Sequence, residues 1–154
     1  MGDWKLEEIN MKSKYRFNIK TLTLTSLLIL LSWQVRAEKI PCKITRIIDG
    51  DTVAIEETLH GLPLSIRILG IDTAEKGKKA KCQKEAKLGA MATEFTTKTI
   101  KHAKKITCEF VKHDKYGGRL LGNIYIDGLS LADSLIKAKL AREYHGEKKQ
   151  SWCN

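Results

Sequence analysis

The stretch from Ile44 to Leu59 constrains the fold more than any other part of the chain. It reads ITRIIDGDTVAIEETL, two strand-like runs interrupted by Asp49-Gly50-Asp51. Asp-Gly between alternating apolar residues is a strong hairpin signal, so the stretch predicts two paired antiparallel strands. Alone, the tripeptide is more often a turn than a site of chemistry. Its acid spacing also lacks the closing Glu of an EF-hand loop.

Apolar periodicity predicts the other elements of the fold. We expect strands at residues 40–48, 52–59, 64–71, 105–111 and 119–126, and helices at 85–104 and 129–140. Ser130 is a candidate N-cap of the second helix. The first helix is expected to pack on the core through Leu88, Met91, Ala92, Phe95, Thr99 and Ala103. This order predicts a β-rich α+β fold, a five-stranded OB-like barrel with two packed helices.

Residues 1–37 are predicted to lie outside this domain, which we assign to residues 38–154. From Met11 a basic stretch precedes an apolar run from about Leu22 to Trp33, and Val35 and Ala37 fit the small-residue positions of a cleavage site. This is the anatomy of a secretory signal peptide behind a short N-terminal extension. A membrane anchor is the alternative, but the run is shorter than the roughly 18–20 apolar residues that span a bilayer. We therefore expect a secreted or periplasmic protein with no stable membrane anchor after cleavage.

Charge and cysteine content suit an exported protein with a polyanionic partner. The chain carries 28 Lys and Arg against 18 Asp and Glu, a net charge of +10, which falls to about +7 without residues 1–37. Nucleic acid, anionic lipid and acidic polysaccharide all fit such a charge. The four cysteines favour two disulfides over a zinc site, and the residues alone leave three pairings open. They are Cys42, Cys82, Cys108 and Cys153.

Acidic and basic residues at the strand ends suggest one catalytic site. Asp51 opens the second strand and Asp72 ends the third, its hairpin partner, so the two carboxylates can converge on a hard cation such as calcium. Glu75 follows closely enough to orient or deprotonate a water molecule. Arg67 and Arg119 offer forked donors to a phosphate whose charge rises in the transition state. These are the components of phosphodiester hydrolysis.

Three ordered segments, IIDGDTV, IRILGIDTAE and DKYGGRLLGNIY, resemble the thermonuclease (staphylococcal-nuclease-like) family over roughly residues 43–144. The resemblance implies an OB-fold nuclease that uses calcium (Ca²⁺) and cleaves DNA and RNA with little sequence specificity, leaving 3′-phosphate ends. It also implies that Gly50 bends the chain so that one carboxylate faces the metal, while Asp49 serves the turn. The implied metal ligands are Asp51, Asp72 and the Thr73 carbonyl; the catalytic residues are Arg67, Glu75 (general base) and Arg119; the substrate contacts are Lys115, Tyr116 and Tyr144.

Two positions within these motifs depart from the family pattern, and the cysteines and Trp152 lead to further expectations. Ala74 stands where the family usually has a proline, and an extra glycine precedes Arg119. In a barrel of this topology the first strand lies beside the fourth, which predicts a Cys42–Cys108 disulfide and leaves Cys82 for Cys153. We expect that disulfide and Trp152 to hold the C-terminal tail against the domain.

Two other classes of function stay open at this point. One is a catalytically inactive nucleic-acid-binding OB module, which would be expected to lack some of the five acid and arginine positions present here. The other is a basic secreted adhesion protein, which explains the charge but not the motifs. For the enzyme we expect a monomer that prefers single strands, because the cleft must approach one phosphate closely. Its binding should weaken as salt rises.

Overall fold

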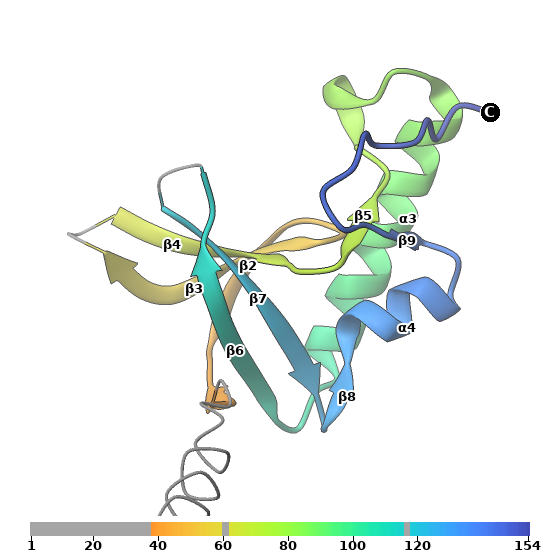
Figure 1. Cartoon of the computed structure of the whole chain (residues 1–154). Helices are drawn as coiled ribbons and strands as arrows, with labels where there is room; N and C mark the ends of the chain where they lie inside the picture. Colours follow the sequence, from red (N-terminus) through yellow and green to blue (C-terminus); the bar gives the residue numbers. More distant parts are fainter. Residues whose placement is uncertain (1–37, 60–61, 116–117) are drawn as a thin grey trace, which may run out of the picture. The chain divides into compact units, whose positions relative to one another are not determined.

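The computed structural model describes residues 38–59, 62–115 and 118–154, all within one structural unit (Figure 1). The segment predicted to be a signal peptide and Tyr116 lie outside the described residues. Among the helices of this described part, none has the length and apolar character needed to cross a membrane.

In the part of the chain that the structure describes, the main sheet has seven strands, five of them long. Figure 1 shows how this sheet curls. Its order is β1-β6-β7-β4-β3-β2, with β8 paired to β7; β4 and β7 run parallel, and the other neighbours are antiparallel. The β-rich α+β class and the OB-like arrangement with two helices are thereby confirmed. The strands are β1 (Ile40–Pro41), β2 (Ile44–Asp49), β3 (Thr52–Leu59), β4 (Leu62–Ile68), β6 (Ile106–His113), β7 (Arg119–Ile126) and β8 (Leu129–Ser130).

A second, two-stranded sheet was not predicted from the sequence. It pairs β5 (Ile71–Thr73) with β9 (Ala141–Glu143). The prediction of one strand over residues 64–71 is wrong, because the chain turns at Leu69 and Gly70. The φ of Gly70 is +81°, a backbone conformation that favours glycine. This turn carries Asp72 into the small sheet, where it lies opposite Arg142.

Helix α3 (Gln83–Lys101) packs on the core partly through the expected residues, but its most buried positions extend onto a neighbouring face. Ala92 is fully buried, and Phe95 contacts the core, as does Ala103 just beyond the helix. Its buried residues are Glu85, Gly89, Ala92 and Thr96, whereas Met91 is 45% exposed. The packing is close: a Cβ added at Gly89 would lie 2.4 Å from the Glu75 carbonyl oxygen. The small residues along this face therefore bring the helix directly against the backbone of the loop that carries Glu75. A short 3₁₀ turn, η1 (Gly77–Lys79), lies between that loop and α3.

Gly50 is required for close packing rather than for a special backbone angle. A Cβ at this position would lie 2.6 Å from Ala92 Cβ on α3. The chain turns at Gly50 and Asp51 between β2 and β3, as expected, but Gly50 is not among the glycines with positive φ, so the turn needs its small size and not its backbone freedom. Its carbonyl accepts a hydrogen bond from Thr96 Oγ1 at 2.8 Å, which anchors the β2–β3 turn to the helix.

The second helix, α4 (Leu131–Lys137), begins at the predicted cap. Ser130 Oγ accepts a hydrogen bond from the Asp133 backbone N–H at 3.1 Å. Leu131 and Leu135 are fully buried and join Ile124 of β7 in the core. This helix therefore covers the sheet and leads the chain into β9.

Two disulfides join the cysteines in the pairing put forward for this barrel topology. Cys42 pairs with Cys108 at a Cα–Cα distance of 5.8 Å, which ties the chain after β1 to β6. Cys82 pairs with Cys153 at 6.0 Å. Because Cys82 is the N-cap of α3, the second disulfide fastens the tail to the start of that helix.

Candidate functional site

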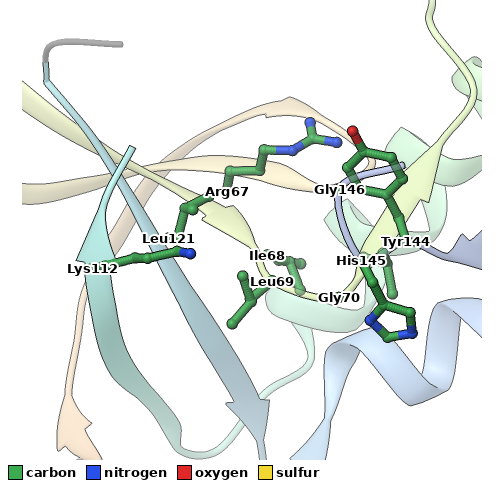
Figure 2. A pocket seen from close by; sticks show the side chains of 10 residues that line it. Arg67, Ile68, Leu69, Gly70, Lys112, Leu121, Tyr144, His145 and Gly146 are labelled. Atoms are coloured by element: carbon green, nitrogen blue, oxygen red, sulfur yellow. The ribbon is translucent and has the colours of Figure 1, made fainter. Parts of the chain in front are cut away.

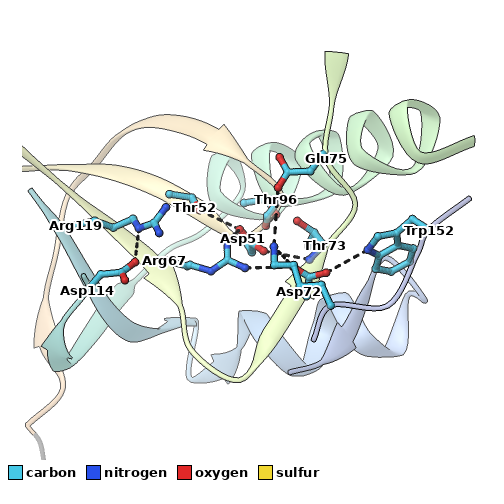
Figure 3. A network of polar contacts seen from close by, with 12 residues as sticks. Asp51, Thr52, Arg67, Asp72, Thr73, Glu75, Thr96, Asp114, Arg119 and Trp152 are labelled. Atoms are coloured by element: carbon cyan, nitrogen blue, oxygen red, sulfur yellow. Dashed lines mark hydrogen bonds and ion pairs between the residues drawn. The ribbon is translucent and has the colours of Figure 1, made fainter. Parts of the chain in front are cut away.

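One guanidinium group connects the two carboxylates expected to meet. Arg67 Nη1 lies 2.9 Å from Asp51 Oδ1, and Arg67 Nη2 lies 3.3 Å from Asp72 Oδ1 (Figure 3). Arg67 comes from β4, opposite Thr52 of β3, which places it beside the turn that carries Asp51. Asp72 arrives from β5, and both carboxylates are buried. Residues from three separate segments thus converge as the sequence predicted.

Further hydrogen bonds fix the Asp51 carboxylate. Thr52 Oγ1 donates to Oδ1 at 2.9 Å, and the Thr73 backbone N–H donates to Oδ2 at 3.1 Å. The pKa of Asp51 is raised to about 6, mainly by burial and also by the negative charge of Asp49, although Arg67 and the Thr73 N–H act in the opposite direction. The ionised carboxylate therefore sits where additional positive charge would stabilise it.

The chemistry of this group of residues fits a hard cation. Asp49 Oδ1 is buried and has no hydrogen-bond partner among the described residues. A buried acceptor of this kind is costly unless water or an ion satisfies it. Carboxylate oxygens are the ligands that calcium and magnesium prefer. Asp51 and Asp72 are therefore suited to hold such an ion, while the role of the Thr73 carbonyl stays a prediction.

A cavity of about 400 Å³ gathers the residues predicted to act on a phosphate. It contains all three predicted catalytic residues and two of the predicted substrate contacts. Its four cationic side chains outnumber its two carboxylates, so it favours an anion. The lining residues are Arg67, Glu75, Asp114, Lys115, Arg119, Leu121, Tyr144 and Lys149.

The two arginines of this cavity stand on neighbouring strands. In the parallel pair β4–β7, Ser65 lies opposite Arg119 and Arg67 lies opposite Leu121. Arg119 Nε donates to Asp114 Oδ2 (Figure 3), a contact that sequence reasoning missed. Although burial raises the pKa of Asp114, hydrogen bonds from Arg119 and the Lys115 N–H outweigh it and lower the pKa below its ordinary value. Asp114 is therefore an ionised partner that can orient Arg119.

Two residues of the C-terminal tail reach Asp72, and sequence reasoning assigned them no place in the site. Lys149 Nζ lies 2.6 Å from Asp72 Oδ1 and 4.0 Å from Glu75 Oε1. Trp152 Nε1 donates to Asp72 Oδ2 at 3.3 Å (Figure 3). Lys149 lies in a polar, basic stretch with no distinguishing pattern. For Trp152 there was one indication in the sequence: it precedes Cys153, and the two were expected to hold the tail against the domain.

Two further cavities adjoin the first and share residues with it. One, of about 370 Å³, includes Asp72, Thr73 and Glu75 among its lining residues, so the carboxylates are reached from the tail side. The other, of about 310 Å³, lies beside Tyr144 and includes Arg67 and Lys112 (Figure 2). An aromatic ring next to a cationic pocket suits a stacked base whose phosphate lies at the arginines.

Comparison with known proteins points to one family. Residues 65–152 match the family model described as staphylococcal nuclease homologue. The match extends from before Arg67 through Trp152 and leaves Asp51 outside.

Three similar proteins are named as endonucleases. The SPbeta prophage-derived endonuclease YokF of Bacillus subtilis (strain 168) is 36% identical over 108 residues, covering 68% of this chain and 34% of that protein. An uncharacterized endonuclease of Escherichia coli O157:H7 is 28% identical over 118 residues, covering 76% and 69% respectively. Endonuclease YncB of Bacillus subtilis (strain 168) is 37% identical over 100 residues, covering 63% and 44%. The chain thus spans about a third of YokF and less than half of YncB.

Proposed function

The chain belongs to the staphylococcal nuclease family, and from this premise we propose that it is a calcium-dependent endonuclease acting on DNA and RNA. It cleaves with little sequence specificity and leaves 3′-phosphate ends. One observation carries the proposal: Arg67 bridges Asp51 and Asp72 at the edge of the cavity that also contains Glu75 and Arg119. The E. coli and Bacillus relatives named as endonucleases support the same reaction class.

Each charged residue of the cavity has a separate role in the proposed hydrolysis. Arg67 and Arg119 bind the phosphate oxygens with forked donors, which stabilise the negative charge that increases in the transition state. Glu75 takes a proton from the attacking water. The water oxygen bonds to phosphorus and the bond from phosphorus to the 5′ oxygen breaks. The 5′ oxygen takes up a proton from solvent and leaves as a hydroxyl, so that the phosphate stays on the 3′ oxygen. Asp114 holds Arg119 in place for this role.

Asp51 and Asp72, together with the Thr73 carbonyl, are the proposed ligands of the calcium ion. Bound there, the ion would lower the pKa of a coordinated water and neutralise phosphate charge. The protein's own contribution is to orient the two carboxylates. Thr52 and the Thr73 N–H donate to Asp51, and Arg67 donates to both Asp51 and Asp72.

Substrate range follows from which groups of the nucleic acid are contacted. Phosphate contacts carry no sequence information, and Tyr144 can stack on any base. A cavity of about 400 Å³ admits one nucleotide phosphate closely, which favours single strands over intact duplex. Every residue assigned to the reaction comes from one chain, so a monomer is sufficient.

Export from the cytoplasm is part of the proposal. The predicted signal peptide supports it, and so do two disulfides, which persist mainly in oxidising compartments. The test is N-terminal sequencing of the protein recovered outside the cytoplasm, where a first residue of Glu38 is expected. A chain recovered there that still begins at Met1 or Met11 would contradict cleavage after Ala37.

The test of the function is cleavage of a single-stranded oligonucleotide with calcium and with a chelator, for the wild-type protein and for Asp72→Asn. We expect products with 5′-hydroxyl and 3′-phosphate ends from the wild type with calcium only, and almost none from the variant. Cleavage that withstands the chelator would overturn the metal assignment. Salt-sensitive DNA binding without cleavage under any divalent ion would instead identify an inactive binding module.

A further inference from the structure

The C-terminal tail supplies much of the environment of one proposed metal ligand. Among the described residues, Asp72 has three side-chain partners: Arg67, Lys149 and Trp152. Two of these three belong to the last six residues of the chain. The orientation of Asp72 therefore depends on how the tail is held.

Trp152 is fixed against the small sheet rather than resting loosely on the surface. Its side chain is 6% exposed, and the Arg142 guanidinium lies 3.7 Å from its ring centre. Arg142 stands opposite Asp72 in the β5–β9 pair and donates to the Ser151 carbonyl at 3.0 Å. The indole N–H is thereby aimed at Asp72 Oδ2.

The tail reaches this position without regular secondary structure of its own. Residues 144–154, all of them described, form no helix or strand. Their covalent fastening is the Cys82–Cys153 disulfide, one residue beyond Trp152, and Lys84 Nζ also contacts the Asn154 carbonyl oxygen. The disulfide therefore limits how far Trp152 can move from Asp72.

We propose that Trp152 is a positioning residue of the metal site and that the Cys82–Cys153 disulfide holds it there. The indole N–H donates to Asp72 Oδ2 and so fixes the carboxylate with Oδ1 turned toward Arg67, which also binds Asp51. Partners of this kind orient metal ligands and strengthen binding. Reduction of this one disulfide lowers cation affinity while the barrel, tied separately through Cys42–Cys108, stays folded. The inference rests on the proposed cation site at Asp51 and Asp72.

The test compares calcium affinity, measured by calorimetry, in matched variants of the full-length protein. Trp152→Phe keeps an aromatic ring but removes the N–H, and Cys82→Ser with Cys153→Ser releases the tail. The matched control, Cys42→Ala with Cys108→Ala, removes the other disulfide, whose sequence separation is 66 residues against 71. Circular dichroism identifies a temperature at which all variants are folded. We expect the first two variants to bind calcium about tenfold more weakly, and the control to bind like the wild type.

A second readout covers the case in which a variant does not fold. In the full chain with Trp4→Phe and Trp33→Phe, Trp152 is the single tryptophan. Its emission should change on adding calcium to the oxidised protein, and a mild reductant should shift the titration midpoint to about tenfold higher calcium. An unchanged midpoint after confirmed reduction of Cys82–Cys153 would overturn the inference.

The outcomes separate this inference from the function on which it rests. Wild-type affinity in Trp152→Phe, or an equal loss in the Cys42–Cys108 control, overturns the inference alone. A wild-type protein that binds no calcium overturns the metal site and the inference together. A protein that binds calcium through Trp152 but does not cut nucleic acid overturns the proposed nuclease and leaves the inference standing.

Discussion

Arg67 Nη1 lies 2.9 Å from Asp51 Oδ1, so the arginine assigned to the phosphate directly contacts a carboxylate assigned to the cation. The two halves of the proposed site are therefore adjacent and share one side chain. The second nitrogen of the same guanidinium reaches Asp72. The two nitrogen donors of the Arg67 guanidinium, held in fixed directions, therefore matter more to the site than the charge of the group.

Arg67→Lys tests whether the fork matters. A lysine keeps the charge but cannot donate to two carboxylates and a phosphate in fixed directions. We expect kcat/KM for single-stranded DNA to fall by about 100-fold or more. The matched control is Arg46→Lys, an exposed arginine on β2, which should change kcat/KM little. Equal, small effects of the two substitutions would contradict the role assigned to Arg67.

Asp51→Asn should change how the stability of the metal-free protein depends on pH. The pKa of Asp51 is raised from 3.8 to about 6 in the folded protein, so the folded state binds this proton more tightly than the unfolded chain does. The proton therefore stabilises the fold fully below about pH 4, and this contribution is lost as pH rises through about 6. The Asp51→Asn variant has no carboxyl group at this position and would lack the contribution at every pH.

The measurement is denaturant unfolding in chelator at pH 5 and pH 8. From pH 8 to pH 5 the wild-type protein should gain roughly 1–1.5 kcal/mol relative to Asp51→Asn. A difference between the two proteins that is the same at both pH values would show that burial does not raise the pKa of Asp51.

Lys149→Gln tests whether the lysine that contacts Asp72 Oδ1, a proposed ligand atom, weakens calcium binding. Because Lys149 Nζ is 2.6 Å from Asp72 Oδ1, its charge opposes a cation at that oxygen. Removing it should tighten calcium binding by up to about fivefold, the scale of a partly exposed charge pair. The same change should raise KM for DNA, since the cavity loses a cation. Lys148→Gln removes an equal charge one position away and should leave calcium affinity closer to that of the wild type. Identical shifts in both variants would indicate only a general charge effect.

Gly89→Ala tests the close packing beneath Glu75. Alanine favours a helix by about 1 kcal/mol over glycine. Its Cβ, however, would lie 2.4 Å from the Glu75 carbonyl oxygen. We expect a net loss of about 1–3 kcal/mol in the free energy of unfolding, because backbone atoms must move. We also expect a lower kcat, because Glu75 moves with them. Thr97→Ala, on the exposed side of the same helix, should stay within about 0.5 kcal/mol of the wild type.

The local elements of the fold were largely readable from the sequence. The boundaries of Thr52–Leu59 and Arg119–Ile126 agree with the alternation of apolar residues, and Ser130 caps α4 as expected. The break between β4 and β5 after Ile68 could not be predicted from the sequence, because β5 forms by pairing with β9, about 70 residues away. Ala92 and Phe95 of α3, and Ala103 just beyond it, pack on the core as predicted. The burial of Gly89 and Thr96 was missed because close contact with a loop and a turn selects small residues there.

The predicted site residues were located through motifs, and the structure brings together those it describes. Asp114 and Lys149 were missed because each depends on a partner distant in space, which no local pattern encodes. Trp152 was linked to the tail but not to Asp72, since the indole reaches a residue 80 positions earlier only through the folded tail.

The most direct measurement is the rate of single-stranded DNA cleavage with saturating calcium by the wild-type protein and by Glu75→Gln, with DNA and calcium affinities measured in parallel. If Glu75 takes the proton from water, the rate should fall by about 100-fold or more while both affinities stay near those of the wild type. Undiminished cleavage by Glu75→Gln would contradict the account of the site.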